Sequence, residues 1–370
     1  MSTSPSHEGR ATRHASWLEL FFDLVFVAAV AALATQLHAD HSVRGLAVFA
    51  GLFIPVWWGW MGYTWYATGF DSDDPVFRLG LLGGMLAIAA LSAGVAGAAS
   101  GDSETFVIAY ACLFYILSAL YGRTWLQAPE ARSLSARFAI GNAFGATLWL
   151  LSLTLAETVR PLVWSAAMLL LIATFVFAPW RSLSRPYDGE HVAERYGLFT
   201  IIVLGESIVV TVAGLEIGSS LSAAIVAVLG FTVAAAIWWL YFDLFRGMPI
   251  HGGFGARFVW AQGHLLIFAG IAAASVGVEF AIEAAVSGES LTLADRLPLA
   301  AGIAVYLLAM AAIRGATRRL DRVVALRLAT AGTVLALGLA GSGLEPLSFV
   351  ALVAALLVGE AAIELPRARR

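Results

Sequence analysis

Apolar stretches of about 20 residues follow one another along almost the whole chain, separated by short polar or glycine- and proline-containing breaks. A helix of that length matches the roughly 30 Å hydrocarbon thickness of a bilayer. Read with a window of about 19 residues, the sequence predicts about twelve transmembrane helices. The predicted spans are 17–38, 45–66, 78–99, 104–125, 135–156, 161–180, 195–215, 219–245, 256–282, 294–314, 322–342 and 345–364.

The composition supports the membrane interpretation. Hydrophobic residues make up 60% of the chain and charged residues 13%, whereas a soluble domain carries about a quarter charged residues. The fold class expected is therefore an all-α polytopic membrane protein. A net charge of -3 argues against nucleic acid as a partner. The single cysteine, Cys112, excludes a disulfide framework and a cysteine metal site, and no cofactor is predicted.

The arginines predict the orientation. All 22 basic side chains are arginines, and if residue 1 is inside, only Arg44, Arg160 and Arg296 fall in outer segments. This positive-inside bias predicts a multi-pass protein of the inner (plasma) membrane with both termini cytoplasmic. We expect a disordered cytoplasmic N-terminus at 1–16 and, because the first span has acidic residues near its start, no removable signal peptide.

The two halves of the chain repeat each other in order. YILSALYGR matches YLLAMAAIR, the doublet Trp57-Trp58 recurs as Trp238-Trp239, and Asp23 falls opposite Glu206. Six spans per half predict two parallel repeats related by a pseudo-twofold axis along the membrane normal. The segments that match are 115–123 with 306–314, 136–141 with 326–331, 161–164 with 346–349 and 83–97 with 263–277.

The repeats define the predicted domain boundaries. The first six-helix repeat covers 17–180 and the second covers 195–364, joined by a cytoplasmic connector at 181–194. Residues 365–370 form a cytoplasmic tail. We expect the lipid bilayer and a small molecule as partners, and the sequence leaves open whether the protein is a homodimer.

Acidic residues inside the spans are the strongest functional signal. Glu19 and Asp23 are four residues apart, which places both carboxylates on one helix face. A charge near the bilayer centre costs at least a few kcal/mol and usually faces a cavity or a partner. Glu206 lies roughly 15 Å into its helix, near the midplane. Asp243 and His264 belong to the same inner half of the membrane, so these residues are predicted to converge on one cavity.

Each of these side chains has a structural alternative. Glu206 is either a neutral or paired structural acid or a protonatable site, and Asp23 could be satisfied by Glu19 and inner arginines. Glu19, nearest to water, is more consistent with a structural role, and His264 alone is more typical of a satisfied core histidine. We predict that Glu206 is the principal proton carrier, with Asp23 as its relay, and that Gly205 allows close approach of a neighbouring helix.

Tryptophan doublets occur in both halves, at Trp57-Trp58 and Trp238-Trp239. Aromatic faces beside carboxylates suit an organic cation through cation–π attraction. The alternative is that these large side chains pack against the many glycine and alanine positions.

The loop GFDSDDPVFR contains Asp71, Asp73 and Asp74, which are weak candidates for a divalent ion. Asp74-Pro75 also matches a helix N-cap followed by proline at the first helical position. No second acidic cluster completes a diphosphate site, so the cap is favoured and no metal site is predicted.

Four segments resemble the motifs of the bacterial low-temperature-requirement A (LtrA) family: ELFFDLVFV at 19–27, WWGWMGYTWYATGFDSDD at 57–74, ERYGLFTIIVLGESI at 194–208 and GHLLIFAGIAAASVGVE at 263–279. The resemblance implies a multi-pass membrane protein connected with growth in the cold, and it implies no particular substrate. The motif positions coincide with Glu19, Asp23, Asp71, Asp73, Asp74, Glu194, Arg195, Glu206 and His264.

Three functions are compatible with these features. A proton-coupled secondary transporter of a small cationic or amphipathic molecule explains the repeats, the midplane acid and the lack of a nucleotide-binding motif. An intramembrane acid-catalysing enzyme, such as a cyclase with an aromatic-lined pocket, is the second, although no G-x-S-x-G motif occurs. The third is a non-catalytic membrane factor for cold growth. The transporter is the favoured prediction, and the protein is more consistent with a non-enzyme.

Overall fold

The computed structural model describes residues 15–70, 74–180, 189–216, 220–245, 254–317 and 320–365. Within these ranges every regular element is a helix. Nine of the described helices are long and apolar enough to cross a membrane, and α7 is a shorter apolar helix. The all-helical membrane fold predicted from the sequence is therefore confirmed, whereas the arrangement of twelve spans stays a prediction.

The N-terminal half of the chain contains eight helical elements. They are α1 (Trp17–Ala39), α2 (Val43–Gly69), α3 (Pro75–Ala93), α4 (Val95–Ser100), α5 (Glu104–Gln127), the 3-10 helix η1 (Pro129–Ala131), α6 (Arg132–Ser152) and α7 (Arg160–Val176). The C-terminal half contains α8 (Gly189–Glu216), α9 (Leu221–Phe245), α10 (Phe254–Ser287), α11 (Leu293–Thr317), α12 (Arg322–Ala340) and α13 (Pro346–Glu364).

Each span predicted from the sequence overlaps a helix, and the span 78–99 is divided between α3 and α4. The division falls at Gly94, where an added Cβ would meet the backbone nitrogen of Phe106 at 2.6 Å. The start of α5 therefore packs directly against the backbone at this break. Two breaks predicted from turn residues are also found, because α4 ends just before Gly101 and α13 begins at Pro346.

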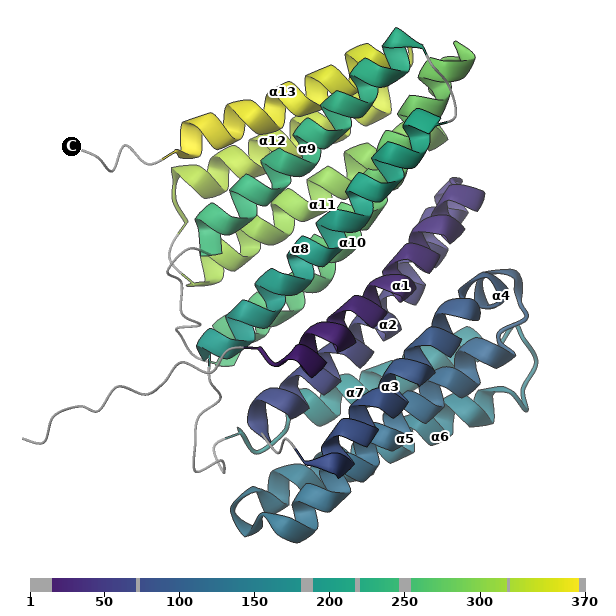
Figure 1. Ribbon diagram of the computed structural model, residues 1–370, viewed down its shortest axis with the longest axis vertical. Coiled ribbons are helices and arrows are strands. Elements are labelled where there is room, and N and C mark those ends of the chain that lie inside the picture. Colours follow the sequence, from purple (N-terminus) through teal and green to yellow (C-terminus); the bar gives the residue numbers. More distant parts are fainter. Residues whose placement is uncertain are drawn as a thin grey trace, which may run out of the picture.

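The helices pack in a similar order in the two halves. In the N-terminal half α1 packs on α2 and α3, and α5 packs on α3 and α6; in the C-terminal half α8 packs on α9 and α10, and α11 packs on α10 and α12. Figure 1 shows α8–α13 as one group and α3–α7 as another, with α1 and α2 between them. In that view α1 begins and α13 ends on the left side of the bundle.

The halves meet where α1 and α2 pack against α8 and α10. In the repeat predicted from the sequence, α2 corresponds to α9 and α3 corresponds to α10. Helices α1 and α8 also correspond, so the α1–α8 contact joins equivalent helices, whereas the other contacts between the halves join non-equivalent ones. The pseudo-twofold relation between the halves stays a prediction.

Backbones touch where α10 packs on α11. A Cβ added to Gly270 would lie 2.6 Å from the carbonyl oxygen of Gly302, and a Cβ added to Gly302 would lie 2.6 Å from that of Gly270. Small residues allow this close approach between membrane helices, where dispersion contacts rather than hydrophobic burial hold helices together. The two helices form the most closely packed pair of the C-terminal half.

The connector predicted at 181–194 overlaps the beginning of a helix. Helix α8 begins at Gly189, so residues 189–194 are helical. The physical reason is that polar side chains of this first part of α8, such as the buried His191, pack on α1 instead of facing water. The remaining connector residues 181–188, most of the predicted disordered N-terminus and the tail from 366 on lie outside the described residues.

Candidate functional site

Charged side chains from the two halves meet at the beginning of α1 and of α8. Glu19 and Asp23 come from α1, His191 and Arg195 come from α8, and none of the four is more than 1% exposed. In each pair the spacing of four residues places both side chains on one helix face. We refer to these four residues as the buried charge cluster.

The start of α1 fixes one end of the cluster. Ser16 is the N-cap, and its hydroxyl oxygen accepts a hydrogen bond from the backbone of Glu19 at 3.2 Å. The Glu19 carboxylate in turn accepts from the backbone N–H of Ser16 at 2.8 Å. This capping box holds one carboxylate oxygen of Glu19 at the helix start and leaves the other directed at α8.

Arg195 joins both acids. Its Nη2 donates to Oδ1 of Asp23 in a short ion pair, and its Nη1 lies 3.5 Å from Oε1 of Glu19. Nε2 of His191 lies 3.2 Å from the same Glu19 oxygen. The shared face predicted for Glu19 and Asp23 is thus confirmed, and the arginine and the histidine are their partners from the other half.

Tryptophan from α2 completes the surroundings of Asp23. Nε1 of Trp60 donates to Oδ1 of Asp23 at 2.8 Å, and its ring lies 5.9 Å from Cζ of Arg195 in a cation–π contact. Trp60 stacks on Trp57 and on Phe199 of α8. The aromatic stack therefore connects the same two halves that the charges connect.

The carboxylates of the buried charge cluster outnumber its guanidinium group. Two carboxylates face one guanidinium, and Oδ2 of Asp23 is buried without a hydrogen-bond partner among the described residues. Because burial of an uncompensated charge costs several kcal/mol, the contacts of Arg195 with both acids favour the packing of α8 against α1.

His264 of α10 is fully buried beyond the aromatic stack, in contact with the ring of Tyr196. Its Nδ1 lies 2.7 Å from the carbonyl oxygen of Trp260, which can only accept, so Nδ1 carries the proton. Nε2 then accepts from the hydroxyl of Tyr241 at 3.0 Å. Both ring nitrogens are satisfied in the neutral form, as expected of the core histidine that the sequence suggested as the alternative.

Comparison with known proteins identifies the family of the chain. A family model described as "Bacterial low temperature requirement A protein (LtrA)" matches residues 14–359. The chain belongs to the LtrA family. An uncharacterized protein of Rhizobium meliloti (strain 1021) is 29% identical over 299 residues, which are 72% of this chain and 69% of that protein. The buried charge cluster lies entirely within the LtrA match.

Glu206 of the LtrA chain does not join the cluster. It is partly exposed on α8, three turns or roughly 16 Å beyond Arg195. Among the described residues its carboxyl group has no hydrogen bond or ion pair. The close helix approach predicted at Gly205 is wrong, because a Cβ added there would meet nothing within 4 Å. Asp23 is enclosed by Arg195 and Trp60 and has no contact with Glu206 among the described residues, so the cavity expected to join the two acids stays a prediction.

The tryptophan doublets of this LtrA protein also do not meet. Trp57 packs beside the cluster, whereas Trp58 points to Phe175 of α7. Trp238 and Trp239 are each 44% exposed on α9. Consecutive residues of a helix point about 100° apart, so a doublet cannot turn both rings to one cavity. Asp243, half-buried near the end of α9, lies apart from all of them.

Asp74 is the N-cap of α3, as favoured from the sequence. Its Oδ1 accepts from the backbone N–H groups of Val76 and Phe77 at 2.9 and 3.0 Å. Arg123 of α5 binds both carboxylate oxygens, at 3.0 and 2.6 Å. These contacts occupy the carboxylate of Asp74; the other two acids of that loop, Asp71 and Asp73, lie outside the described residues.

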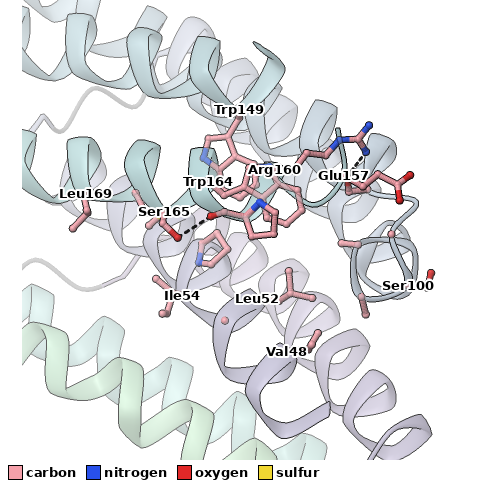
Figure 2. Close-up of a pocket in the computed structure, with 18 of the residues that line it drawn as sticks. Val48, Leu52, Ile54, Ser100, Trp149, Glu157, Arg160, Trp164, Ser165 and Leu169 are labelled. Carbon is pink, nitrogen blue, oxygen red and sulfur yellow. Dashed lines mark hydrogen bonds between the residues drawn. The ribbon is translucent and has the colours of Figure 1, made fainter. Parts of the chain in front are cut away.

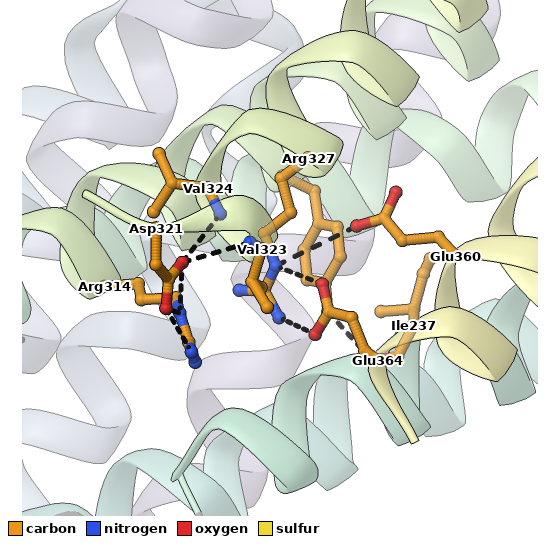
Figure 3. Close-up of polar contacts among 9 residues, drawn as sticks. Ile237, Arg314, Asp321, Val323, Val324, Arg327, Glu360 and Glu364 are labelled. Atoms are coloured by element: carbon orange, nitrogen blue, oxygen red, sulfur yellow. Dashed lines mark hydrogen bonds and ion pairs between the residues drawn. The ribbon is translucent and has the colours of Figure 1, made fainter. Parts of the chain in front are cut away.

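Another buried ion pair lies within the C-terminal half. Arg327 of α12 binds both carboxylate oxygens of Glu364 of α13, at 2.8 and 2.6 Å, and lies 3.8 Å from Glu360 (Figure 3). On the corresponding helix of the N-terminal half, Arg137 of α6 donates to the carbonyl oxygen of Thr174 of α7 at 3.1 Å. Each arginine therefore fastens the last helix of its own half.

A pocket of about 660 Å³ opens between α2, α4 and α7. Its walls include Leu52, Ile54 and the tryptophan Trp164, and its polar lining includes Glu157 and Arg160 (Figure 2). The lining contains no member of the buried charge cluster. The pocket was not predicted from the sequence, because it depends on how α2 and α7 diverge.

Sequence reasoning also missed a second polar contact between the halves. At the far end of α1, His38 and His41 face Glu279 and Glu283 of α10 and Asp295 of α11. We refer to these five residues as the outer polar cluster. The spacing of four residues between Glu279 and Glu283 is a signal that could have found half of this cluster, but nothing in the sequence relates them to the histidines.

Proposed function

We propose that this LtrA protein is a proton-coupled secondary transporter with twelve spans, whose two halves move against each other during transport. The observation that carries the proposal is the buried charge cluster, which lies in the contact between α1 and α8. Ionisable residues inside membranes are costly and mark ion or substrate pathways. A buried ion pair seldom stabilises a protein more than an apolar replacement would, so its position between two halves favours a role in switching.

The distribution of polar contacts along the interface supports movement of this kind. The buried charge cluster joins α1 to α8 at one end, and the outer polar cluster joins α1 to α10 at the other. Aromatic rings such as Trp57 and Phe268 lie between the two. Alternating access to a central site requires the interface to open first at one end and then at the other. Ion pairs located at the two ends can be broken one after the other in this way.

The repeat gives further support. Arg137 and Arg327 occupy matching segments of the two halves and each binds the last helix of its own half. Both ends of the described chain lie on one side of the bundle, which agrees with an even number of spans. Together with the arginine bias, this supports a plasma-membrane protein with both termini in the cytoplasm.

We assign the proton to two places. The buried charge cluster can hold one, and Glu206, which lies on α8 and is partly exposed, exchanges protons with its surroundings. A small cationic or amphipathic molecule is the proposed substrate. The structure favours this function over the intramembrane enzyme, because the apolar pocket and the buried acids are in different parts of the molecule.

Flux through proteoliposomes tests the proposal. The purified protein is reconstituted with an internal pH indicator, a pH gradient is imposed, and a panel of small organic cations and amphiphiles is added. Glu206→Gln keeps the shape of the protonated acid but cannot titrate, so it should insert normally and abolish proton-coupled flux. Glu104→Gln, at an exposed acid at the start of α5, is the matched control and should retain it.

Two results would contradict the proposal. One is a correctly inserted Glu206→Gln protein that couples flux to the pH gradient like the wild type. The other is wild-type protein that moves no member of the panel, with or without a gradient, yet restores growth in the cold to cells that lack it. The second result would instead support a non-catalytic membrane factor.

A further inference from the structure

The outer polar cluster brings side chains from both halves close together. Nδ1 of His38 lies 3.2 Å from Oε2 of Glu279, and Nε2 of the same ring lies 3.6 Å from Oε1 of Glu283. Nε2 of His41 lies 3.4 Å from Oδ1 of Asp295. All five side chains are partly exposed, so the cluster is accessible from the aqueous phase.

Hydrogen bonds account for only part of this arrangement. Nδ1 of His38 and Nδ1 of His41 are buried atoms without a hydrogen-bond partner among the described residues. The 3.2 Å contact is within the range of an ion pair, and the 3.6 Å contact is too long for a hydrogen bond. A neutral imidazole has only one N–H to donate, yet both nitrogens of His38 face a carboxylate.

The charges of the cluster are unbalanced as well. The charged groups that act on Glu283 are Glu279, Asp295 and the two histidines, and no arginine is among them. Among the described residues, the cationic partners that act on Glu283 and its two neighbouring carboxylates are therefore the two histidines, not a group of fixed charge. Such a site attracts a positive ion, and a divalent ion more strongly than a monovalent one.

The donor atoms fit a metal ion in both chemistry and spacing. One ligand atom each from His38, Glu279 and Glu283 all lie within 4.8 Å of one another. Ligands about 2.1 Å from zinc are roughly 3.4 Å apart in a tetrahedron, so small rotations of these side chains place all three on one ion. Imidazole nitrogen together with carboxylate oxygen is a donor set typical of zinc and its first-row neighbours.

We propose that the outer polar cluster is a binding site for a divalent transition-metal ion, with zinc as the best fit. His38, Glu279 and Glu283 are the direct ligands, and water completes the coordination. Phe280 stacks on the ring of His38 at 4.8 Å and meets the ring of His41 edge-on at 4.7 Å, which fixes both histidines. Asp295 orients His41 beside the metal.

The ligands come from α1 in one half and α10 in the other. An ion bound here fastens the halves together at the end opposite the buried charge cluster. Metal binding would thus favour the arrangement seen in this structure, in which α1 and α10 are in contact at that end. The site stands independently of the transport proposal, because binding is measured on purified protein without any flux.

Equilibrium dialysis and cobalt absorption test the site. Full-length protein in detergent micelles is stripped with a chelator and then titrated with Zn²⁺ or with Co²⁺, whose visible spectrum reports nitrogen and oxygen ligation. We expect about one ion per chain. His38→Asn and Glu279→Gln should each weaken binding at least about tenfold, whereas Glu289→Gln, an exposed acid on the following loop, should not.

Two further readouts separate ligation from folding. Zn²⁺ should raise the thermal unfolding temperature of the wild type and of Glu289→Gln but not of the ligand variants. Binding should weaken below neutral pH, because protons compete for the imidazole. The proposal is overturned if the wild type binds no stoichiometric metal, or if Glu279→Gln binds it as tightly as Glu289→Gln does. Should His38→Asn not fold, Glu279→Gln decides alone.

Discussion

Removing the arginine from the buried charge cluster should harm the protein more than removing an acid. Arg195→Gln leaves Glu19 and Asp23 without the guanidinium that contacts both. Asp23→Asn instead leaves Arg195 opposite Glu19, which is a balanced pair, and the new amide oxygen can still accept from Trp60. The two substitutions remove the same ion pair but leave different charges behind.

The expected magnitudes follow from what remains buried. Leaving a buried charge uncompensated costs about 3–5 kcal/mol, so this is the expected loss for Arg195→Gln. Asp23→Asn loses a hydrogen bond to a charged group, which is about 1.5–3 kcal/mol. In the double variant Glu19 retains His191, so its loss should be smaller than the sum of the two by about 1–3 kcal/mol.

Unfolding in mixed micelles with a denaturing detergent measures these losses. Tryptophan fluorescence is a suitable signal because Trp57 and Trp60 pack beside the cluster. Arg132→Gln, an exposed arginine at the start of α6, is the control and should change stability by less than about 0.5 kcal/mol. The reasoning is refuted if Arg195→Gln is no more destabilising than Asp23→Asn, or if the losses add.

Two other predictions concern packing and pH. Gly302→Ala should cost about 1–3 kcal/mol of stability in the same assay, because its Cβ would meet the backbone oxygen of Gly270 at 2.6 Å. A Cβ added at Gly332 meets nothing within 4 Å, so Gly332→Ala should be neutral. Equal losses of stability for the two variants would contradict this prediction. The hydrogen bond from Arg314 lowers the pKa of Asp321, the N-cap of α12, to about 2. The stability that the ionised Asp321 carboxylate contributes is present above its unfolded pKa near 3.8 and is lost as pH falls towards 2. Asp321→Asn should reduce the loss of stability between about pH 4 and pH 2 by less than about 1 kcal/mol. An unchanged loss of stability over this pH range would contradict the lowered pKa of Asp321.

The sequence predicts the fold class and the shared face of the two acids because both depend on local regularities. Apolar stretch length indicates helices that suit a bilayer, and a spacing of four residues places Glu19 beside Asp23. It does not identify Arg195 as their particular partner, because 172 residues separate Asp23 from Arg195 and many arginines are available. Such pairings depend on how helices pack, which periodicity does not contain.

Two expectations about contacts have the same weakness. Glu206 was expected to meet Asp23 because the repeats place them opposite each other, but equivalent positions in a repeat need not be in contact. Gly205 was interpreted as a contact point, yet a small residue permits close approach without requiring it. The outer polar cluster was missed because His38 and Glu279 become neighbours only when α1 packs against α10.

The long separation between the acids and their arginine has a consequence for biosynthesis. Chains are made from the N-terminus at about 5–20 residues per second, so the 172 residues between Asp23 and Arg195 take roughly 9–34 s to synthesise. During that interval α1 carries two carboxylates whose guanidinium does not yet exist. The partner that both acids contact in the folded protein therefore becomes available only when the beginning of α8 has been made.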